Sequence, residues 1–393
     1  MKILQIVPSI SLVYGGPSQM VLGLSSALAE AGIEVTIVTT DSNGDVGQAP
    51  LDVPLGVPIA ENGYEIIYFR CSPFRRYKFS IDLLQWLSKN AQNYDLAHIH
   101  ALFSPVSSCS AAVARSRQLP YILRPLGTLD PADLQKKRQL KRLYAAVLER
   151  SNLARAAAVH FTSDQEAKIS ERFNTVTHDL VIPLGVSLPP SNSSSIREKF
   201  SIPSGKPILL FMSRIEPKKG LDLLLPALEK LNQNFHFVLA GANPQDPIYE
   251  TAIRDRIQSS PLKDKTSIVG FITGAEKTAL LETADLFVLP SYYENFGIAV
   301  AEAMSVGTPV VISNQVHIWQ EIERSHSGWI CSCDVESLTQ TLNEALHDRV
   351  EQLRRGKNAQ IHAKQNYSWN AIAQQMITAY GEIQRANSKS ANP

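Results

Sequence analysis

Short runs of apolar residues alternate along this chain with longer stretches in which apolar residues recur every three or four positions. The short runs predict buried β-strands, and the longer stretches predict amphipathic helices. In the first half the predicted strands are Lys2–Val7, Glu34–Thr40, Glu65–Arg70, Leu96–Ala101, Pro120–Gly127, Ala158–Ser163 and Asp179–Gly185. Helices are predicted between these strands, as at 18–32 and 81–92. Regular alternation of strand and helix is typical of a doubly wound parallel α/β sheet.

A second alternating series begins after residues 184–195, where Pro and Ser cluster as in a linker. Its predicted strands are Pro207–Ile215, Phe235–Gly241, Thr266–Ile272, Leu286–Ser291 and Thr308–Ser313. A chain of 393 residues exceeds what one hydrophobic core usually organises. We therefore expect one Rossmann-like domain at 1–185, a second at 186–365, and a segment 366–393 with an amphipathic helix and a frayed polar tail.

Composition narrows the class of protein. The chain is 44% hydrophobic and 19% charged, which is typical of a soluble globular protein. Its four cysteines are scattered, and Cys331-x-Cys333 lacks the second pair of a structural zinc site, so we expect reduced thiols in a cytoplasm. The N-terminal apolar run is short for a signal peptide, and no run of about eighteen apolar residues predicts a membrane span.

The stretch Leu289–Ile312 carries the most informative candidates. It predicts a short strand, a polar loop, a helix that begins near Gly297, and a second strand. Glu294 lies in the loop, and Glu302 lies about one and a half turns inside the helix. The backbone N–H groups at positions 296–298 are expected to lack helical partners, which suits a pyrophosphate. An ordinary strand–helix–strand unit with solvated acids is the alternative interpretation.

Two cations follow the apolar run 207–212, whose carboxyl end is the edge at which open α/β sheets bind ligands. The guanidinium of Arg214 offers a planar fork to a phosphate, and the ammonium of Lys219 is a compact charge. Together they can neutralise a diphosphate without a metal, and the sequence has no Asp-x-Asp pair to bind one. A solvated basic turn is the alternative interpretation.

The first half offers weaker candidates at its own strand ends. Gly15 and Gly16 occupy the first strand-to-helix turn, where a side chain blocks the approach of a phosphate or sugar, although a plain tight turn explains them equally. His98 and His100 alternate along one strand and point to the same face, with His100 nearer the carboxyl end. We interpret His98 as a core residue.

A long basic helix is predicted at about residues 131–158. It carries five cations within seven positions, beside apolar residues. These cations are Lys136, Lys137, Arg138, Lys141 and Arg142. A solvated face is one interpretation, and electrostatic docking on anionic lipid is the other. Nucleic acid is not expected as a partner, because no aromatic interleaving or binding module accompanies the charge.

The segments ADLFVLPS, ENFGIAVAEAM and GTPVV occur in this order and resemble the E-x7-E signature of retaining glycosyltransferases of family 4, which have the GT-B fold. SRIEPKKG is similar to the family's GR…KG motif, with Ser213 in place of Gly, and ILRPLGTLDP resembles a segment of polysaccharide-building members. The resemblance implies two Rossmann-like domains facing a central cleft, the first binding the acceptor and the second the nucleotide sugar. It also implies that the last helix crosses back onto the first domain.

The resemblance further implies transfer of a hexose, with retention, from a nucleoside diphosphate sugar such as UDP-glucose to a hydroxyl of a lipid-linked or polysaccharide acceptor. The expected setting is cell-envelope or exopolysaccharide synthesis in the cytoplasm, with peripheral contact to the inner face of the membrane, and no cofactor or metal is expected. The implied catalytic residues are Glu294, His100, Arg214 and Lys219. The implied donor-binding residues are Gly16, Arg214, Lys219, Gly241, Phe271, Ile272, Glu294, Asn295, Phe296, Gly297, Ile298 and Glu302. The implied acceptor-binding residues are Gly15, His100 and Arg124.

Several alternatives stay open at this point. A front-face displacement, in which the leaving phosphate helps to deprotonate the acceptor, competes with a double displacement that uses Glu294 as nucleophile. A nicotinamide-dependent dehydrogenase would hold a ribose with Asp41, but the preceding loop lacks the Gly-x-Gly-x-x-Gly fingerprint. A GT-B-like sugar-nucleotide epimerase or a non-catalytic sugar-nucleotide binder would use the same donor residues.

Overall fold

The computed structural model describes residues 1–44, 48–72, 78–135, 138–191 and 196–391. The chain divides into two compact units. The first unit consists of Met1–Gly185 together with Trp369–Pro393, and the second consists of Val186–Ser368. Helix α15 (Arg349–Asn366) extends to the end of the second unit, so the returning segment starts at Trp369 rather than at the expected residue 366.

An eight-stranded sheet forms the centre of the first unit. Its strands are β1 (Lys2–Ile6), β2 (Glu34–Thr40), β3 (Pro58–Glu61), β4 (Tyr64–Phe69), β5 (Leu96–His100), β6 (Tyr121–Arg124), β7 (Ala158–Phe161) and β8 (Asp179–Val181). Their order is β3-β4-β2-β1-β5-β6-β7-β8, and the pairs are parallel except for the edge hairpin of β3 and β4. Strand β3 was not predicted, because its four residues are largely exposed and follow a Pro- and Gly-rich stretch.

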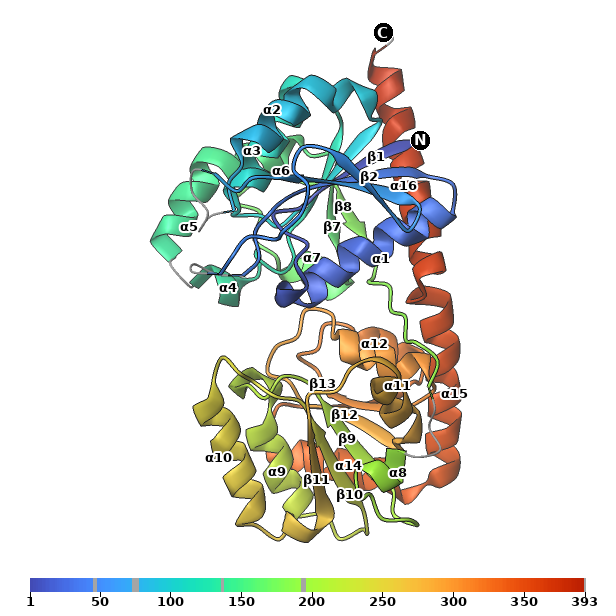
Figure 1. Ribbon diagram of the computed structural model, residues 1–393. Coiled ribbons are helices and arrows are strands. Elements are labelled where there is room, and N and C mark those ends of the chain that lie inside the picture. The colour runs from blue at the N-terminus through green and yellow to red at the C-terminus, as the bar shows by residue number, and fades with distance from the viewer. Residues whose placement is uncertain (45–47, 73–77, 136–137, 192–195, 392–393) are drawn as a thin grey trace. The chain divides into compact units, whose positions relative to one another are not determined.

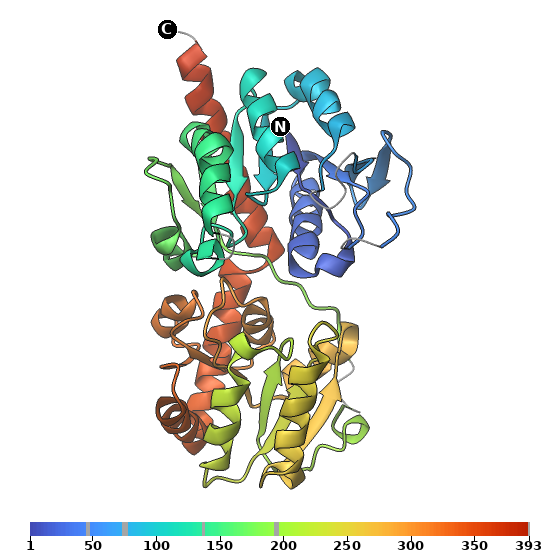
Figure 2. The ribbon, with the colours of Figure 1, turned by 90° about the vertical axis from the view of Figure 1, so that its left-hand side faces the viewer.

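Helices cover both faces of this sheet and form two separate cores (Figure 1). They are α1 (Gly16–Glu30), α2 (Ile81–Asn90), α3 (Pro105–Ser116), α4 (Pro131–Gln135), α5 (Arg138–Tyr144), α6 (Arg150–Arg155), α7 (Asp164–Ile169) and α16 (Trp369–Ala391). On one face α2 and α3 lie side by side and bury Leu83, Leu87 and Val106 against the strands (Figure 2). On the other face α1 packs beside α16.

Helix α16 completes the first unit although it lies far from the rest of that unit in sequence. It buries Met376 and Tyr380 against β1 and α1. The Trp369 ring fills the space above two glycines, since a Cβ on Gly23 or Gly185 would lie 2.4 or 2.2 Å from ring atoms. The helix continues through Ala391, so the expected fraying of the tail from residue 386 is not what the structure shows.

The predicted long basic helix is confirmed in its described parts, and one π-helical turn interrupts its α-helical hydrogen bonding. The described part consists of α4, then α5, then one π-helical turn at Ala145–Glu149, then α6. The π turn directs Glu149 into the protein, where its carboxylate accepts hydrogen bonds from the Phe103 N–H (2.8 Å) and the Ser108 hydroxyl (2.6 Å). Two of the predicted cations, at 136 and 137, lie outside the described residues.

The second unit contains a parallel six-stranded sheet. Its strands are β9 (Ile208–Met212), β10 (His236–Ala240), β11 (Thr266–Gly270), β12 (Leu286–Leu289), β13 (Val310–Ser313) and β14 (Gly328–Cys331). The order β11-β10-β9-β12-β13-β14 is that of a nucleotide-binding Rossmann sheet. In such a sheet the strand order reverses at one point, which here lies between β9 and β12. Strand β14 was not among the predicted strands.

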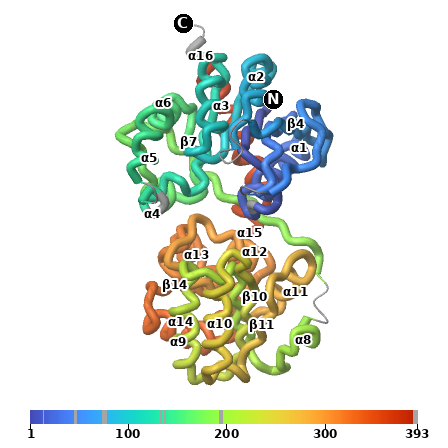
Figure 3. The backbone as a smooth tube through the Cα atoms, turned by 60° about the vertical axis from the view of Figure 1, so that its left-hand side comes forward, coloured from blue at the N-terminus to red at the C-terminus, as the bar shows by residue number. Residues whose placement is uncertain are grey.

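Helices again cover both faces of the second sheet. They are α8 (Ile196–Lys199), α9 (Leu221–Glu229), α10 (Pro247–Gln258), α11 (Gly274–Thr283), α12 (Ile298–Ser305), α13 (Trp319–Arg324), α14 (Val335–His347) and α15. Helices α9 and α14 lie side by side on one face (Figure 3), and α12 packs against α11 and α15 on the other. Along the described helices, none combines the length and apolar composition needed to cross a bilayer.

Candidate active site

The carboxyl ends of β9 and β12 lie next to each other, at the point where the strand order of the second unit reverses. Ligands of open α/β sheets bind in the crevice at this point. The turn after β9 and the loop after β12 touch backbone to backbone: a Cβ on Gly220, at φ 74°, would lie 2.1 Å from the Pro290 carbonyl oxygen. The Tyr292 N–H also donates to the Lys218 carbonyl (2.9 Å). The fold therefore holds the two predicted groups of site residues together.

Lys219 and Glu294 form a direct ion pair across these two loops. Their side chains are only 9% and 20% exposed, so the pair is shielded from solvent. The backbone of Glu294 is fixed in turn, because its N–H donates to the Gln315 carbonyl (3.1 Å) and its carbonyl accepts from His317 (3.0 Å). Two residues that are 75 positions apart are thus oriented toward the same point.

Arg214 lies in the same turn as Lys219 but is more accessible. Its side chain is 58% exposed, and its guanidinium pairs with the Glu216 carboxylate at 3.2 Å. The Lys218 ammonium lies 3.5 Å from the same carboxylate. The turn thus carries two cations that differ in exposure. The Lys219 ammonium is shielded and paired across the loops, whereas the Arg214 guanidinium lies at the surface. The sequence indicated Glu294 as a site residue, but it indicated neither its pairing with Lys219 nor the role of Glu216.

Helix α12 begins in the geometry that the sequence predicted. Its N-cap is Gly297 in the left-handed region (φ 80°), where a Cβ would lie 3.2 Å from both Val300 and Val316 side chains. Within the described residues the backbone N–H groups at 296–298 donate no hydrogen bond. These donors stand at the positive end of a helix and can bind an anion. The Phe296 ring is buried against Tyr367, with 5.3 Å between the ring centroids.

Glu302 lies on α12, more than one turn beyond the N–H groups at 296–298. Its carboxylate pairs with the ammonium of Lys277 on α11. Burial raises the pKa of the Glu302 carboxyl above its usual value, and the Lys277 ammonium acts in the opposite direction by stabilising the carboxylate. Lys277 was missed from the sequence, because only the contact between α11 and α12 brings it to the site.

The remaining donor candidates lie on neighbouring strand ends. A Cβ on Gly241 would lie 1.9 Å from the Ser213 carbonyl oxygen, so this glycine permits the close approach of β10 to the turn that carries Arg214. The Gly241 N–H donates to the Gly270 carbonyl (2.7 Å). Phe271, after β11, exposes 77% of its surface, and Ile272 beside it is half-buried.

Two polar oxygens near the cluster are buried without a partner in the described structure. They are the Asn295 Oδ1 and the Ser291 Oγ, both in the loop after β12. Buried polar atoms are almost always hydrogen-bonded, and these two oxygens are free to accept hydrogen bonds from a polar ligand. Among the described residues, no group of three or more His, Cys, Asp and Glu side chains is placed to hold a metal ion.

In the first unit, His100 and Arg124 are register partners on β5 and β6. The His100 Nε2 bonds the Gln5 side-chain oxygen (2.7 Å), and its ring stacks on His98, with 4.5 Å between the centroids. Within the described structure the His100 Nδ1 and the Arg124 Nε have no hydrogen-bond partner. The Arg124 guanidinium is buried, and its Nη2 donates to the Met20 sulfur (3.7 Å).

Burial sets the charge state of this cluster. It lowers the pKa of Arg124 to about 10 and the pKa of His160 to about 3, and it lowers the pKa of His100 well below the usual histidine range. The Arg124 guanidinium therefore stays charged at neutral pH, while the neighbouring imidazoles stay neutral. His98 is a core residue as predicted, and its Nδ1 bonds the Tyr380 hydroxyl at 2.9 Å.

Comparison with known proteins settles the family. Residues 192–362 match the model of the glycosyl transferases group 1, and residues 15–185 match that of the glycosyl transferase 4-like domain. The chain belongs to the group 1 glycosyltransferases. The resemblance inferred from the motifs is thereby confirmed, and the dehydrogenase alternative is wrong. Asp41 has a structural role in this glycosyltransferase, since its carboxylate accepts from the Cys71 N–H (2.8 Å).

Individual relatives cover the glycosyltransferase to different extents. An uncharacterized glycosyltransferase of Methanocaldococcus jannaschii is 28% identical over 189 residues, so the match spans about half of each chain (47% of both). The D-inositol 3-phosphate glycosyltransferase of Xylanimonas cellulosilytica is 25% identical over 394 residues, which cover 94% of this chain and 92% of that protein.

The crystal structure of HepE from Anabaena in complex with UDP-glucose superimposes on the glycosyltransferase with a TM-score of 0.74. The superposition covers 97% of this chain and all of HepE, at 19% identity. A likeness at this identity shows the fold, which is GT-B with two parallel-sheet α/β domains, as predicted.

Proposed function

We propose that this glycosyltransferase transfers a hexose, with retention at the anomeric carbon, from a nucleoside diphosphate sugar to a hydroxyl of a lipid-linked or polysaccharide acceptor in cell-envelope or exopolysaccharide synthesis. The observation that carries the proposal is the meeting of Lys219, Glu294 and the α12 N-terminus where β9 and β12 end. UDP-glucose is the donor we propose first, because HepE binds it and shares the fold.

The donor diphosphate fits the cationic end of this site. The N–H groups at 296–298 and the ammonium of Lys219 supply directed donors, and Arg214 can add a bidentate contact because its side chain is exposed. Lys219 has three N–H donors, so it can hold Glu294 and a phosphate oxygen at the same time. These groups stabilise the charge that develops on the departing diphosphate, which is usually the largest catalytic contribution. The proposal therefore requires no metal cofactor.

The nucleoside of the donor fits the end of the site that contains Glu302. Glu302 can accept hydrogen bonds from two vicinal ribose hydroxyls, with Lys277 keeping its carboxyl ionised. The backbone at Gly270–Ile272 would contact the base. Asn295 and Glu294 would hold hydroxyls of the sugar, and an Oδ1 without a partner is suited to accept from one. We assign Glu294 to positioning rather than to attack on carbon, because its carboxylate is bound to an ammonium that lowers its nucleophilicity.

Donor identity is tested by thermal unfolding with a panel of nucleotide sugars. A ligand at about 100 times its Kd stabilises the folded protein by about 2.7 kcal/mol, and UDP-glucose should give the largest shift. Larger shifts with a guanosine or adenosine donor would contradict the UDP assignment. Retention is tested by the anomeric configuration of the product in NMR, and a chelator should leave turnover unchanged.

The catalytic assignment is tested with Arg214→Ala and Lys219→Ala. Each should lower kcat/KM about 100-fold to 1000-fold, corresponding to about 2.7–4 kcal/mol of lost transition-state stabilisation. Lys230→Ala is the matched control, because Lys230 is an exposed lysine that ends α9 of the same unit. Turnover at the wild-type rate in both site variants would remove the diphosphate assignment. Interconversion of free donor sugars without acceptor would instead indicate an epimerase.

A further inference from the structure

Three buried histidines of the first unit belong to one chain of hydrogen bonds. His98 and His100 lie on β5 and His160 lies on β7, and none of the three is more than 2% exposed. A neutral imidazole has one nitrogen that donates and one that accepts, and the hydrogen-bond partners decide which is which. In this chain a backbone carbonyl at one end settles the choice for every member.

The chain begins at the carbonyl of Ile182, which can only accept. It lies 2.8 Å from the His160 Nε2, so this nitrogen carries the proton. Burial lowers the pKa of His160 to about 3, so the ring is neutral and its Nδ1 has no proton. That Nδ1 lies 3.3 Å from the His98 Nε2, which must therefore donate. Burial also lowers the pKa of His98 well below its usual value, so the ring stays neutral and its Nδ1 is an acceptor.

The same logic continues through Tyr380 and Gln5. The Tyr380 hydroxyl donates to the His98 Nδ1 at 2.9 Å, and its oxygen accepts from the Gln5 Nε2 at 3.4 Å. This orientation directs the Gln5 Oε1 to the His100 Nε2 at 2.7 Å. His100 therefore donates with Nε2, and its Nδ1 carries only a lone pair. The reverse arrangement would require both ring protons on His160, which the low pKa of that imidazole opposes.

The far end of the chain is open. In the part of the protein that the structure describes, the buried His100 Nδ1 has no hydrogen-bond partner. Arg124, the register partner of His100 on β6, offers the complementary group, because its Nε–H has no acceptor there either. An anion can accept from Arg124 but cannot donate to the His100 Nδ1, whereas a hydroxyl can do both. The two side chains are therefore suited to a hydroxyl group.

The chain orients His100 but cannot carry a proton away from it. A proton taken up at Nδ1 would have to be passed on to the Ile182 carbonyl, which is not basic. We propose that this chain holds His100 in the Nε2–H tautomer, so that its Nδ1 accepts a hydrogen bond from a sugar hydroxyl. Gln5, Tyr380 and His160 are then positioning residues that act through His100. Their part in the reaction rests on the proposed sugar transfer, whereas the tautomer does not.

The tautomer is measured on the full-length protein without ligand. Its nine histidines are labelled with ¹⁵N, and each signal is assigned by its loss in a single histidine variant. Long-range ¹H–¹⁵N correlation spectra between about pH 5 and about pH 8, where ordinary histidines titrate, show which ring nitrogen carries the proton. We expect His98, His100 and His160 to keep the Nε2–H form throughout. A proton on the His100 Nδ1, or a charged His160, would overturn the proposal.

Substitutions at His160 test whether the chain sets the tautomer at a distance. His160→Phe removes the link to the Ile182 carbonyl, so the two directions of the chain become comparable. His100 should then show both tautomers, although it makes no bond to His160. His160→Gln keeps an N–H for the carbonyl and an oxygen for the His98 Nε2, so it should restore the single tautomer. A single His100 tautomer in His160→Phe would refute control by the chain.

Kinetics connect the tautomer with the reaction. Tyr380→Phe and His160→Phe should each lower kcat/KM for sugar transfer about threefold to tenfold, the contribution of about one hydrogen bond, with UDP binding unchanged. Tyr121→Phe is the matched control, because this buried hydroxyl also donates one bond, to the Asn152 carbonyl (2.8 Å), at the other end of β6.

Equal losses in Tyr380→Phe and Tyr121→Phe would reduce the chain to a structural role. Full activity in Tyr380→Phe would overturn the assignment of a sugar hydroxyl, since a water molecule at the His100 Nδ1 would then suffice. A protein that transfers no sugar from any donor would refute the proposed function instead, and the spectra would still decide the tautomer.

Discussion

Lys277→Met gives the most informative single perturbation of the donor site. Lys277 is bonded to Glu302, and the two side chains are 25% and 11% exposed. Burial already raises the pKa of Glu302, and the ammonium of Lys277 is the group that opposes this shift. Removing the ammonium therefore raises the Glu302 pKa further. A protonated carboxyl cannot accept hydrogen bonds from both ribose hydroxyls as a carboxylate does.

The expected size follows from the hydrogen bonds that change. Bonds to a charged group contribute about 1.5–3 kcal/mol and bonds between neutral groups about 0.5–1.5 kcal/mol, so protonation costs on the order of 1–2 kcal/mol of binding free energy. This corresponds to an increase of about fivefold to thirtyfold in the Kd for UDP. The loss should be largest at acid pH and should shrink as pH rises and Glu302 ionises.

Calorimetric titration of UDP between about pH 5 and pH 8 measures this effect. The terminal phosphate of UDP itself titrates near about pH 6, so the ratio of variant to wild-type Kd is the quantity to follow. Lys277→Arg keeps the charge and should restore the wild-type curve, and Lys230→Met is the exposed control. A ratio that does not change with pH would refute the reasoning about Glu302. A ratio of one throughout would show that Glu302 does not bind the ribose.

Folding stability should respond to pH in the opposite sense. A carboxyl with a raised pKa binds its proton more tightly in the folded than in the unfolded protein. Its contribution to the free energy of unfolding is therefore full below the unfolded pKa and is lost as pH rises through the folded pKa. Denaturant titrations should show a steeper loss of stability above about pH 4.5 in Lys277→Met than in wild type.

Three further substitutions test the packing around the two sheets. Gly241→Ala should destabilise the protein by more than about 2 kcal/mol, because the backbone φ of 149° and a Cβ at 1.9 Å from the Ser213 carbonyl oxygen leave no room for a side chain. An unchanged Tm would contradict this prediction. Tyr380→Phe should cost about 1–2 kcal/mol in denaturant unfolding through the lost bond to His98, with UDP binding unchanged. Trp369→Ala should cost about 3 kcal/mol by emptying the space that its ring fills, and a loss below the error of the measurement would show that α16 is held elsewhere.

The sequence predicted those elements whose apolar runs are continuous and clearly bounded. The strand 34–40 was predicted with its observed limits, because a buried run lies between Gly32 and a turn-rich stretch. The four-residue strands β3 and β14 lacked such runs. The π turn at Ala145–Glu149 was also beyond a periodicity argument, since it depends on a hydrogen-bonding niche for Glu149 made by residues about 40 positions earlier.

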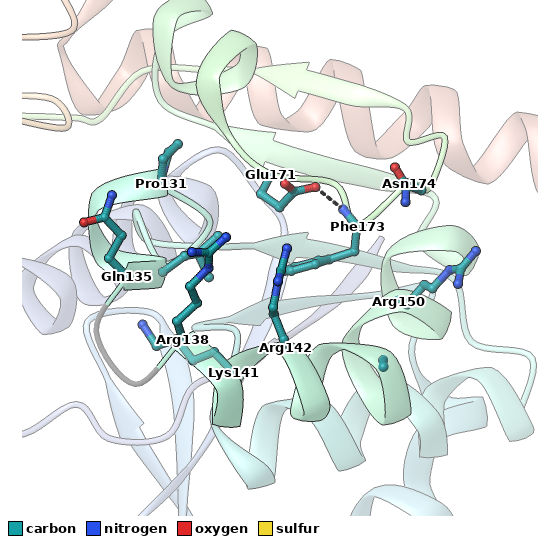
Figure 4. A pocket seen from close by; sticks show the side chains of 11 residues that line it. Pro131, Gln135, Arg138, Lys141, Arg142, Arg150, Glu171, Phe173 and Asn174 are labelled. Carbon is teal, nitrogen blue, oxygen red and sulfur yellow. Dashed lines mark hydrogen bonds between the residues drawn. The ribbon is translucent and has the colours of Figure 1, made fainter.

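The residues of the candidate site likewise fall into those that the sequence predicted and those that it did not. Residues at strand ends, such as Arg214 and Gly297, were found because strand ends and helix starts are visible in the sequence. Lys219, Glu294 and Glu302 were also predicted, but Lys277 and the pairings Lys219–Glu294 and Lys277–Glu302 were not, because these are contacts between elements. Strand order decides such contacts, and local propensity does not encode it. A cavity of about 630 Å³ between α5 and the loop after α7 (Figure 4) was not predicted either, because the sequence does not connect these two segments.

The return of α16 to the first unit has a consequence for how the protein is made. Residues 1–185 leave the ribosome long before Met376 and Tyr380 exist, yet these side chains form part of the core on one face of that sheet. Until they arrive, that face exposes apolar surface to water or to chaperones, while the intervening second unit can fold completely on its own. Maturation of the first unit is therefore coupled to the synthesis of α16.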